Sequence, residues 1–325
     1  MWSGTDRHPR PADTLATSIA RGVAFLDSRQ RSDGELPVNA SGTPDPAVFP
    51  TAVMVHALSR APGAQRVHDR ALDFLQSEMD PRGLWRHWPA RHPHHAIIPP
   101  DLDDTACASA ALERAGRPLP DNRHRLIGNR TSAGLFRTWV ITRVEARHPI
   151  TLYGFFTRTS AKPFDVDAVV NANVLHYLGP GPHARPVVQF LARALEQGRE
   201  RQCDKWYENP FVVWYFFSRA LSVAAPELRS LMLTRLSSAA PSNPLETALM
   251  ACSLAYWKEP FEVEAILDHQ LESGGWPSAA LYHGGRARRR DGSFSAPHPD
   301  APHWGSEELT TAFCIEALSR RLTGR

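Results

Sequence analysis

Residues 101–116, DLDDTACASAALERAG, are one of six segments that decide the fold of this 325-residue chain. Each segment starts at or near a Pro, Asp, Asn or Ser and continues with apolar residues at helical spacing on more than one face. Helices of this kind are expected to be buried. The other copies are PAVFPTAVMVHALSRA (46–61), DVDAVVNANVLHYLG (165–179), NPFVVWYFFSRALS (209–222), NPLETALMACSLAYW (243–257) and SEELTTAFCIEALSRR (306–321).

Amphipathic segments with a charged face alternate with these six. They span 13–29, 65–79, 184–199, 225–238 and 260–272. The less regular region 117–160 is expected to hold a sixth outer helix and a long connection. Six buried helices enclosed by six outer ones predict an all-α protein, an (α/α)6 barrel, as one domain over residues 1–325 with a flexible start at 1–12. Only residues 138–144 hint at a β-strand.

The composition excludes several classes of protein. A net charge of +3 is too small to indicate a nucleic-acid partner, and no run of about 18 apolar residues predicts a membrane span. The N-terminus has no apolar core, so no signal peptide is expected. The four cysteines are widely spaced and are interpreted as small buried hydrophobes, which fits a reducing, cytoplasmic location.

A shorter repeat follows the outer segments. Gln270 is followed by Gly274 and Trp276, and the same spacing gives Gln30, Gly34 and Leu36; a third copy ends in Gly83 and Trp85 without an aligned Gln. In this pattern the Gly ends a helix and the aromatic residue covers its end. The spacing resembles the QW repeat of squalene and terpene cyclases, which identifies a fold and not a reaction.

The start of the second buried segment resembles a catalytic motif. Residues 99–106, PPDLDDTA, resemble the DxDD element of class II terpene cyclases, including squalene-hopene cyclase. The resemblance implies that Asp103 protonates an isoprenoid alkene or epoxide and that Asp101 and Asp104 tune it. Crowded carboxyl groups cannot all ionise, so the group retains a proton, and the helix N-terminus favours the conjugate base. The alternative is that one of these aspartates only caps a helix.

The starts of the inner helices of such a barrel meet at one mouth, where a binding cavity is expected. Aromatic faces there would stabilise a carbocation without attacking it. The candidate substrate-binding aromatic residues are Phe49, Trp206, Tyr207, Phe211, Trp214, Tyr215 and Trp304.

A second acidic start suggests a diphosphate site. Asp165 and Asp167 are candidate ligands for Mg²⁺, which prefers oxygen donors and would hold a substrate diphosphate. Asn171, Arg158 and Lys162 are further candidate contacts to the substrate. The alternative is another helix cap followed by a solvated basic loop.

The residues and the resemblance together predict a class II terpene cyclase, an isomerase or intramolecular lyase. It would cyclise a C15 or C20 prenyl diphosphate or a related isoprenoid by protonation and retain the diphosphate. Familiar class II cyclases pair two barrels, whereas this chain has one. The loop 284–298, a second copy in a homodimer, another partner or a membrane surface would therefore close the cavity. The alternatives are a carbohydrate lyase or hydrolase that pairs Asp103 with Glu307 or Asp167, or a non-catalytic isoprenoid-binding barrel.

Overall fold

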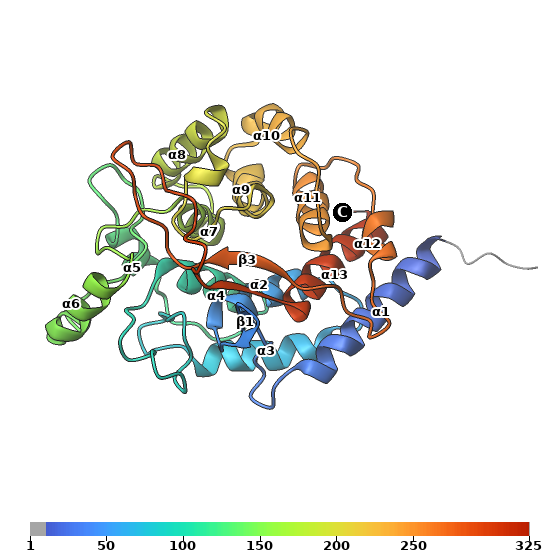
Figure 1. Cartoon of the computed structure of the whole chain (residues 1–325), viewed down its shortest axis with the longest axis horizontal. Coiled ribbons are helices and arrows are strands. Elements are labelled where there is room, and N and C mark those ends of the chain that lie inside the picture. Colours follow the sequence, from blue (N-terminus) through green and yellow to red (C-terminus); the bar gives the residue numbers. More distant parts are fainter. Residues whose placement is uncertain (1–10, 325) are drawn as a thin grey trace, which may run out of the picture.

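Six helices correspond to the six segments expected to be buried, and two of them extend two residues beyond their segments. The structure of the chain is a computed structural model that describes residues 11–324. The six helices are α2 (Val48–Leu58), α4 (Leu102–Arg114), α7 (Ala168–Leu178), α9 (Pro210–Ala224), α11 (Pro244–Tyr256) and α13 (Glu307–Thr323). Each packs against the next, and α13 also packs against α2, so the contacts run in a cycle (Figure 1).

Amphipathic helices cover the outside of this cycle. They are α1 (Pro11–Arg29), α3 (Gln65–Ser77), α5 (Arg123–Gly128), α8 (Ala184–Glu196), α10 (Arg229–Leu236) and α12 (Glu264–Asp268). In α3, for example, the buried residues Val67, Ala71, Phe74 and Leu75 recur at helical spacing. The last two outer helices are shorter than expected; residues 226–228 form a 3₁₀ turn that starts at Pro226.

The region 117–160 holds one further helix. This is α6 (Pro149–Arg158), which lies at one end of the molecule (Figure 1). A flexible start was expected at residues 1–12. Residues 1–10 lie outside the described residues, and Pro11 and Ala12 belong to α1. None of the described helices is both long enough and apolar enough to cross a membrane.

A small antiparallel sheet corrects the purely helical expectation. Its strands, in spatial order, are β2 (Thr43–Pro44), β1 (Asn39–Ala40), β4 (His303–Ser306) and β3 (Ala279–His283). These strands have two to five residues, too few for an alternating pattern to stand out in the sequence. The predicted strand at 138–144 is wrong, because Trp139 forms only an isolated bridge to Asp101.

The short repeats fasten the outer helices to the starts of the inner ones. The amide of Gln270 donates to the carbonyl of Gly274 (2.8 Å), and that of Gln30 donates to the carbonyl of Gly34 (2.9 Å). Three threonines near the starts of α2, α4 and α13 accept the backbone N–H that follows each glycine turn. The pairs are Leu36 with Thr51, Trp85 with Thr105, and Trp276 with Thr311.

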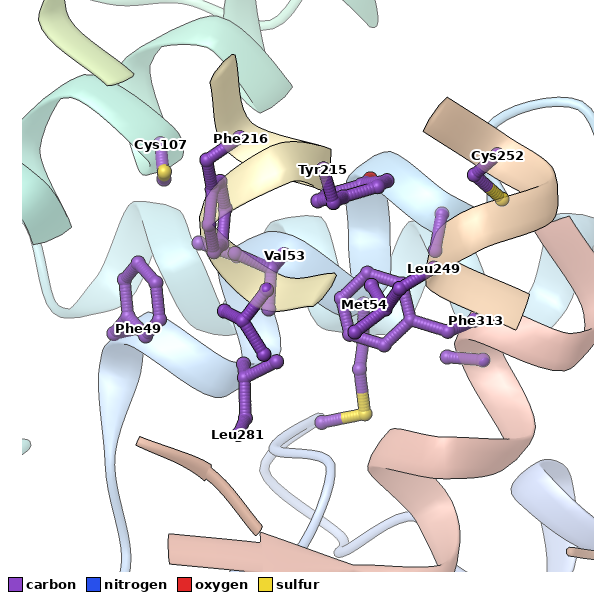
Figure 2. Close-up of a cluster of buried hydrophobic side chains, with 14 of the residues drawn as sticks. Phe49, Val53, Met54, Cys107, Tyr215, Phe216, Leu249, Cys252, Leu281 and Phe313 are labelled. Atoms are coloured by element: carbon purple, nitrogen blue, oxygen red, sulfur yellow. The ribbon is translucent and has the colours of Figure 1, made fainter. Parts of the chain in front are cut away.

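Below the mouth, side chains fill the space between the inner helices. Figure 2 shows Val53 and Met54 from α2, Tyr215 and Phe216 from α9, and Phe313 from α13 among side chains that meet in this core. All five are essentially inaccessible to solvent. The cavity beside the acid box therefore lies above this core, at the end of the helix cycle where the inner helices start.

Candidate active site

A cavity of about 380 Å³ opens at the starts of the inner helices. Seven of the predicted site residues line it, namely Phe49, Asp101, Asp103, Asp104, Trp206, Tyr207 and Trp304. The sheet contributes Tyr282 and Trp304, and α6 contributes Phe155. The helix starts therefore converge as expected, and two elements that the sequence did not reveal complete the wall.

Asp101 caps α4 and so fixes the orientation of the acid box. Its side chain accepts the backbone N–H of Asp104 at 2.8 Å, and its backbone is extended (φ −124°, ψ 165°). The Asp101 N–H donates to the carbonyl of Trp85 (3.2 Å). The capping interpretation is thus correct for Asp101, and the cap leaves Asp103 and Asp104 in the first turn of the helix.

Asp103 is a buried carboxyl group with a donor on each oxygen. Asn173 Nδ2 donates to Oδ1 at 2.5 Å, and the Tyr207 hydroxyl donates to Oδ2 at 2.6 Å. Burial raises the pKa of Asp103 to about 7, although both hydrogen bonds act to lower it. A carboxyl group with this pKa retains its proton in a large fraction of molecules at neutral pH, and both donors then stabilise the carboxylate that proton transfer leaves.

Asp104 supplies a second buried carboxyl group. Only 2% of the residue is exposed, and its Oδ1 has no hydrogen-bond partner among residues 11–324. Burial and the charge of Asp101 raise the pKa of Asp104 well above its usual value, and burial also raises the pKa of Asp101. The pKa of each of the three carboxyl groups is therefore raised, which favours retention of protons in the acid box.

Sequence reasoning missed a buried cation behind the acid box. Arg219 is 2% exposed, donates to Asn173 Oδ1 and lies 5.0 Å from the centroid of the Phe216 ring. The bond holds the amide of Asn173 with its NH₂ group toward Asp103. The sequence did contain a signal, because Arg219 is the one charged residue in the apolar segment 209–222.

Aromatic rings form the walls of the cavity. Trp304 stacks on Tyr282, with centroids 5.1 Å apart and planes 7° apart, and Phe49 meets Tyr282 edge-on at 5.7 Å. Asp45 Oδ2 accepts the indole N–H of Trp304 (2.7 Å) and of Trp88 (3.3 Å). Rings held in this way present π faces that can stabilise a cation.

Three of the predicted aromatic residues do not line the cavity. Trp214 donates its indole N–H to Glu200 (3.0 Å), and Tyr215 donates its hydroxyl to Glu316 (2.9 Å). Phe211 packs against Trp214, with centroids 5.2 Å apart. Their helix α9 is buried on several faces, so most of its aromatic side chains belong to the core.

The contacts around Asp165 and Asp167 do not fit a resident Mg²⁺ ion. Asp165 is buried and pairs with the ammonium of Lys205 at 2.5 Å, while Asp167 accepts the hydroxyl of Thr138 at 2.6 Å. The side-chain oxygen of Asn171 accepts the N–H of Phe136 (2.9 Å), and its side-chain nitrogen donates to the carbonyl of Phe136 (3.0 Å). Within residues 11–324, no group of three or more His, Cys, Asp or Glu residues is arranged to hold a metal ion.

The predicted basic contacts also lie away from the cavity. Arg158 and Lys162 are exposed, and the ammonium of Lys162 donates to the carbonyl of Phe156 (2.9 Å). In the loop 284–298, Arg286 is only 3% exposed and donates to backbone carbonyls such as that of Arg201 (2.8 Å). It therefore braces the cavity wall from behind and is not available to grip an anionic substrate.

Comparisons with known proteins support the fold. The sequence matches no protein-family model, and no curated protein is significantly similar to it. Comparison with solved structures shows that the chain has a class II terpene cyclase-like fold. It is similar to the type II terpene cyclase MstE from Scytonema (TM-score 0.71, 16% identity, 96% of this chain and 100% of that chain).

Two further structures are similar. One is a protein from Actinoplanes (TM-score 0.68, 19% identity, 95% of this chain and 99% of that chain). The other is ent-copalyl diphosphate synthase from Streptomyces platensis (TM-score 0.50, 17% identity, 86% of this chain and 50% of that chain). Variants of MstE have been solved in complex with geranylgeranyl dihydroxybenzoate (substrate) and with merosterolic acid A (product).

Proposed function

We propose that this protein is a class II terpene cyclase, built as an (α/α)6 barrel, in which Asp103 is the catalytic acid. The observation that supports this best is the placement of Asp103. It is a buried carboxyl group in an aromatic cavity, with a raised pKa and a hydrogen-bond donor on each oxygen. Capping alone does not account for it, since Asp101 already caps the helix.

The proposed reaction begins with proton transfer from Asp103 to an alkene carbon of the substrate. A C–H bond forms, and the neighbouring, more substituted carbon becomes cationic. Tyr207 and Asn173 stabilise the carboxylate through bonds that exist before the reaction, so little reorganisation is required. Further alkenes of the chain attack the cation and close rings while the surrounding π faces stabilise the charge.

The substrate is proposed to be a C15 or C20 isoprenoid. A cavity of about 380 Å³ suits a small-molecule ligand. The head group of this substrate is a diphosphate or another polar group. Arg158 and Lys162, the predicted contacts to a diphosphate, lie outside the cavity. Mg²⁺ bound through a substrate diphosphate stays a prediction. Activity that survives EDTA would contradict it.

A peripheral membrane contact is part of the proposal. Beside the cavity, α6 and its flanks expose Ile150 (86%), Tyr153 (73%) and Phe164 (73%). The one acidic residue of segment 141–164, Glu145, is buried and paired with Arg82, whereas the segment also holds Arg143, Arg147, Arg158 and Lys162. Exposed apolar side chains among cations suit an anionic lipid surface.

Vesicle sedimentation tests the membrane contact. The wild type should sediment with phosphatidylglycerol vesicles more than with phosphatidylcholine vesicles, and Ile150→Asp should weaken this binding. Equal recovery of both proteins in the supernatant would contradict the contact. A homodimer and a cytoplasmic location stay predictions; size-exclusion chromatography with light scattering checks the first.

Product analysis tests the reaction. Purified protein would be incubated with farnesyl diphosphate, geranylgeranyl diphosphate and a geranylgeranylated dihydroxybenzoate, and products would be identified by mass spectrometry. Cyclic products are expected from the wild type and from the surface control Asp73→Asn, but not from Asp103→Asn. Cleavage of oligosaccharides without turnover of any prenyl substrate would support the carbohydrate-active alternative. Unchanged, tightly bound prenyl chains would support a non-catalytic barrel.

A further inference from the structure

His87 faces the same cavity as the acid box but comes from a different part of the wall. It is half-buried and lies two residues after Trp85, whose indole N–H donates to the carbonyl of Leu75 (2.7 Å). The backbone carbonyl of His87 accepts the N–H of Val48 (2.8 Å) at the start of α2. The backbone that carries the imidazole is therefore anchored at Trp85 and at His87 itself.

Aromatic rings surround the imidazole of His87. Its ring meets Trp88 at 5.2 Å, Tyr282 at 5.8 Å and Trp304 at 5.8 Å, each nearly edge-on. Within residues 11–324, neither ring nitrogen makes a hydrogen bond. Two nearby histidines differ: His92 pairs with Asp45 (3.2 Å), and His95 bonds to the carbonyl of Trp88 (2.8 Å).

The electrostatics keep this imidazole neutral. Burial lowers the pKa of His87 to about 4, and the opposing attraction of Asp45 is too weak to restore it. A neutral imidazole has a lone pair on one ring nitrogen. His87 is therefore an unprotonated base in a chamber that is otherwise lined mainly by aromatic and other apolar groups.

The base and the acid are separated in the cavity. Asp103 is bonded to Tyr207, the Tyr207 and Tyr282 rings lie 6.1 Å apart, and Tyr282 in turn contacts His87. The two groups are thus connected through the rings of Tyr207 and Tyr282, and within residues 11–324 the imidazole of His87 makes no hydrogen bond to Asp103. A reaction that adds a proton at one carbon of a substrate and removes one from another carbon needs an acid and a base that do not neutralise each other.

We propose that His87 is the catalytic base that ends the cyclisation, an inference that rests on the proposed function. One ring nitrogen takes a proton from a carbon adjacent to the cationic carbon of the cyclised intermediate. The electron pair of that C–H bond becomes the new alkene. The imidazolium then releases its proton to water, and the Asp103 carboxylate takes a proton from water. The overall change is an isomerisation without a co-reactant.

A weak base is sufficient for this step. A carbocation is a far stronger acid than an imidazolium ion, so even an imidazole with a low proton affinity accepts its proton. The same low affinity lets the imidazolium discharge before the next turnover. The position of the imidazole along the wall would decide which proton is lost, and hence where the product alkene lies.

The test replaces the base without opening the wall. His87→Phe retains an aromatic ring, and His269→Phe serves as a matched control on the exposed outer helix end. Both would be compared with the wild type on the substrate that the wild type consumes, with products resolved by gas chromatography and mass spectrometry. Circular dichroism confirms folding; if His87→Phe unfolds, His87→Gln takes its place in the same assay.

The expected result is a changed product. Substrate consumption by His87→Phe should stay within about ten-fold of wild type, because protonation by Asp103 is unaffected. The share of the wild-type alkene should fall about ten-fold or more, in favour of other alkene isomers or a water-captured alcohol. An unchanged product, or a wild-type product that is itself an alcohol, would overturn the proposal. Failure of the wild type to consume any prenyl substrate would instead contradict the proposed function.

Discussion

The hydroxyl of Tyr207 donates to Oδ2 of Asp103 at 2.6 Å, and so joins two residues that lie 104 positions apart. The bond is formed only because the loop before α9 and the first turn of α4 meet at the same mouth. The strength of the acid therefore depends on a donor that lies outside the DLDD motif.

Substitution of Tyr207 by Phe should weaken the acid. The bond lowers the pKa of Asp103, so its loss should raise that pKa above about 7. Because only the protonated form can donate, the fall of activity at high pH should move to higher pH. The maximal rate should drop, since a hydrogen bond to a charged group is worth about 1.5–3 kcal/mol.

Initial rates between pH 5 and 9 measure both effects. Tyr282→Phe is the matched control, because its hydroxyl has no partner among the described residues. A Tyr207→Phe variant whose pH profile overlies that of the wild type would show that the bond does not tune Asp103.

Asp103→Asn should be inactive yet more stable at high pH. The folded-state pKa of Asp103, about 7, lies above the ordinary value of 3.8. Between these values the folded state holds a proton that the unfolded state has lost, so stability is full below about pH 4 and falls as pH rises toward 7. The variant lacks this loss. Urea denaturation at pH 5 and 8 should show its relative free energy of unfolding increasing with pH; a constant difference would refute the raised pKa.

Lys205→Met should destabilise the fold. Its ammonium is 1% exposed and pairs with Asp165, so its removal leaves an uncompensated buried carboxylate that costs about 3–5 kcal/mol. Adding Asp165→Leu should recover much of that loss. Urea denaturation with and without Mg²⁺ measures both effects. If Asp165 instead held Mg²⁺, the ion would stabilise the wild type and Lys205→Met would have little effect.

Gly274→Ala should cost more than about 1 kcal/mol. Gly274 has φ +91°, and an added Cβ would lie 2.6 Å from the carbonyl oxygen of Arg21 on α1. Gly116→Ala is the matched control, because Gly116 also has positive φ (+66°) but has open space around it. Thermal melts should rank wild type, Gly116→Ala and Gly274→Ala in falling order. Equal melting points for the two variants would show that the close approach to Arg21 costs nothing.

The sequence predicted the parts of the site that local pattern encodes. The buried helices have a strong period, and their starts are marked by Asp101, Asn209 and Asn243, which cap them. This pattern was enough to bring the acid box together with Phe49 and Tyr207. The pattern could not distinguish the aromatic residues that line the cavity, such as Tyr207, from the aromatic residues of α9, which belong to the core.

The rest depends on contacts distant in sequence. Tyr282 and Trp304 line the cavity from one face of the sheet because they are direct partners across β3 and β4, in a register that shifts between Ala280 and Tyr282. No local signal marks such a bulge. The partners of Asp165 were equally hidden, because Lys205 is 40 residues away, and an Asp at a helix start looks the same whether it meets a metal or a lysine.

The pairing of β1 with β4 has a consequence for biosynthesis. Asn39 and Ala40 pair with Gly305 and Trp304, and α1 and α2 both pack against α13. The sides of α1 and α2 that face α13 are therefore covered only after α13 has been synthesised. Such late contacts make folding slow and leave the nascent chain prone to aggregation. This chain is thus expected to depend on chaperones during synthesis more than a protein in which the helices that pack together are also adjacent in sequence.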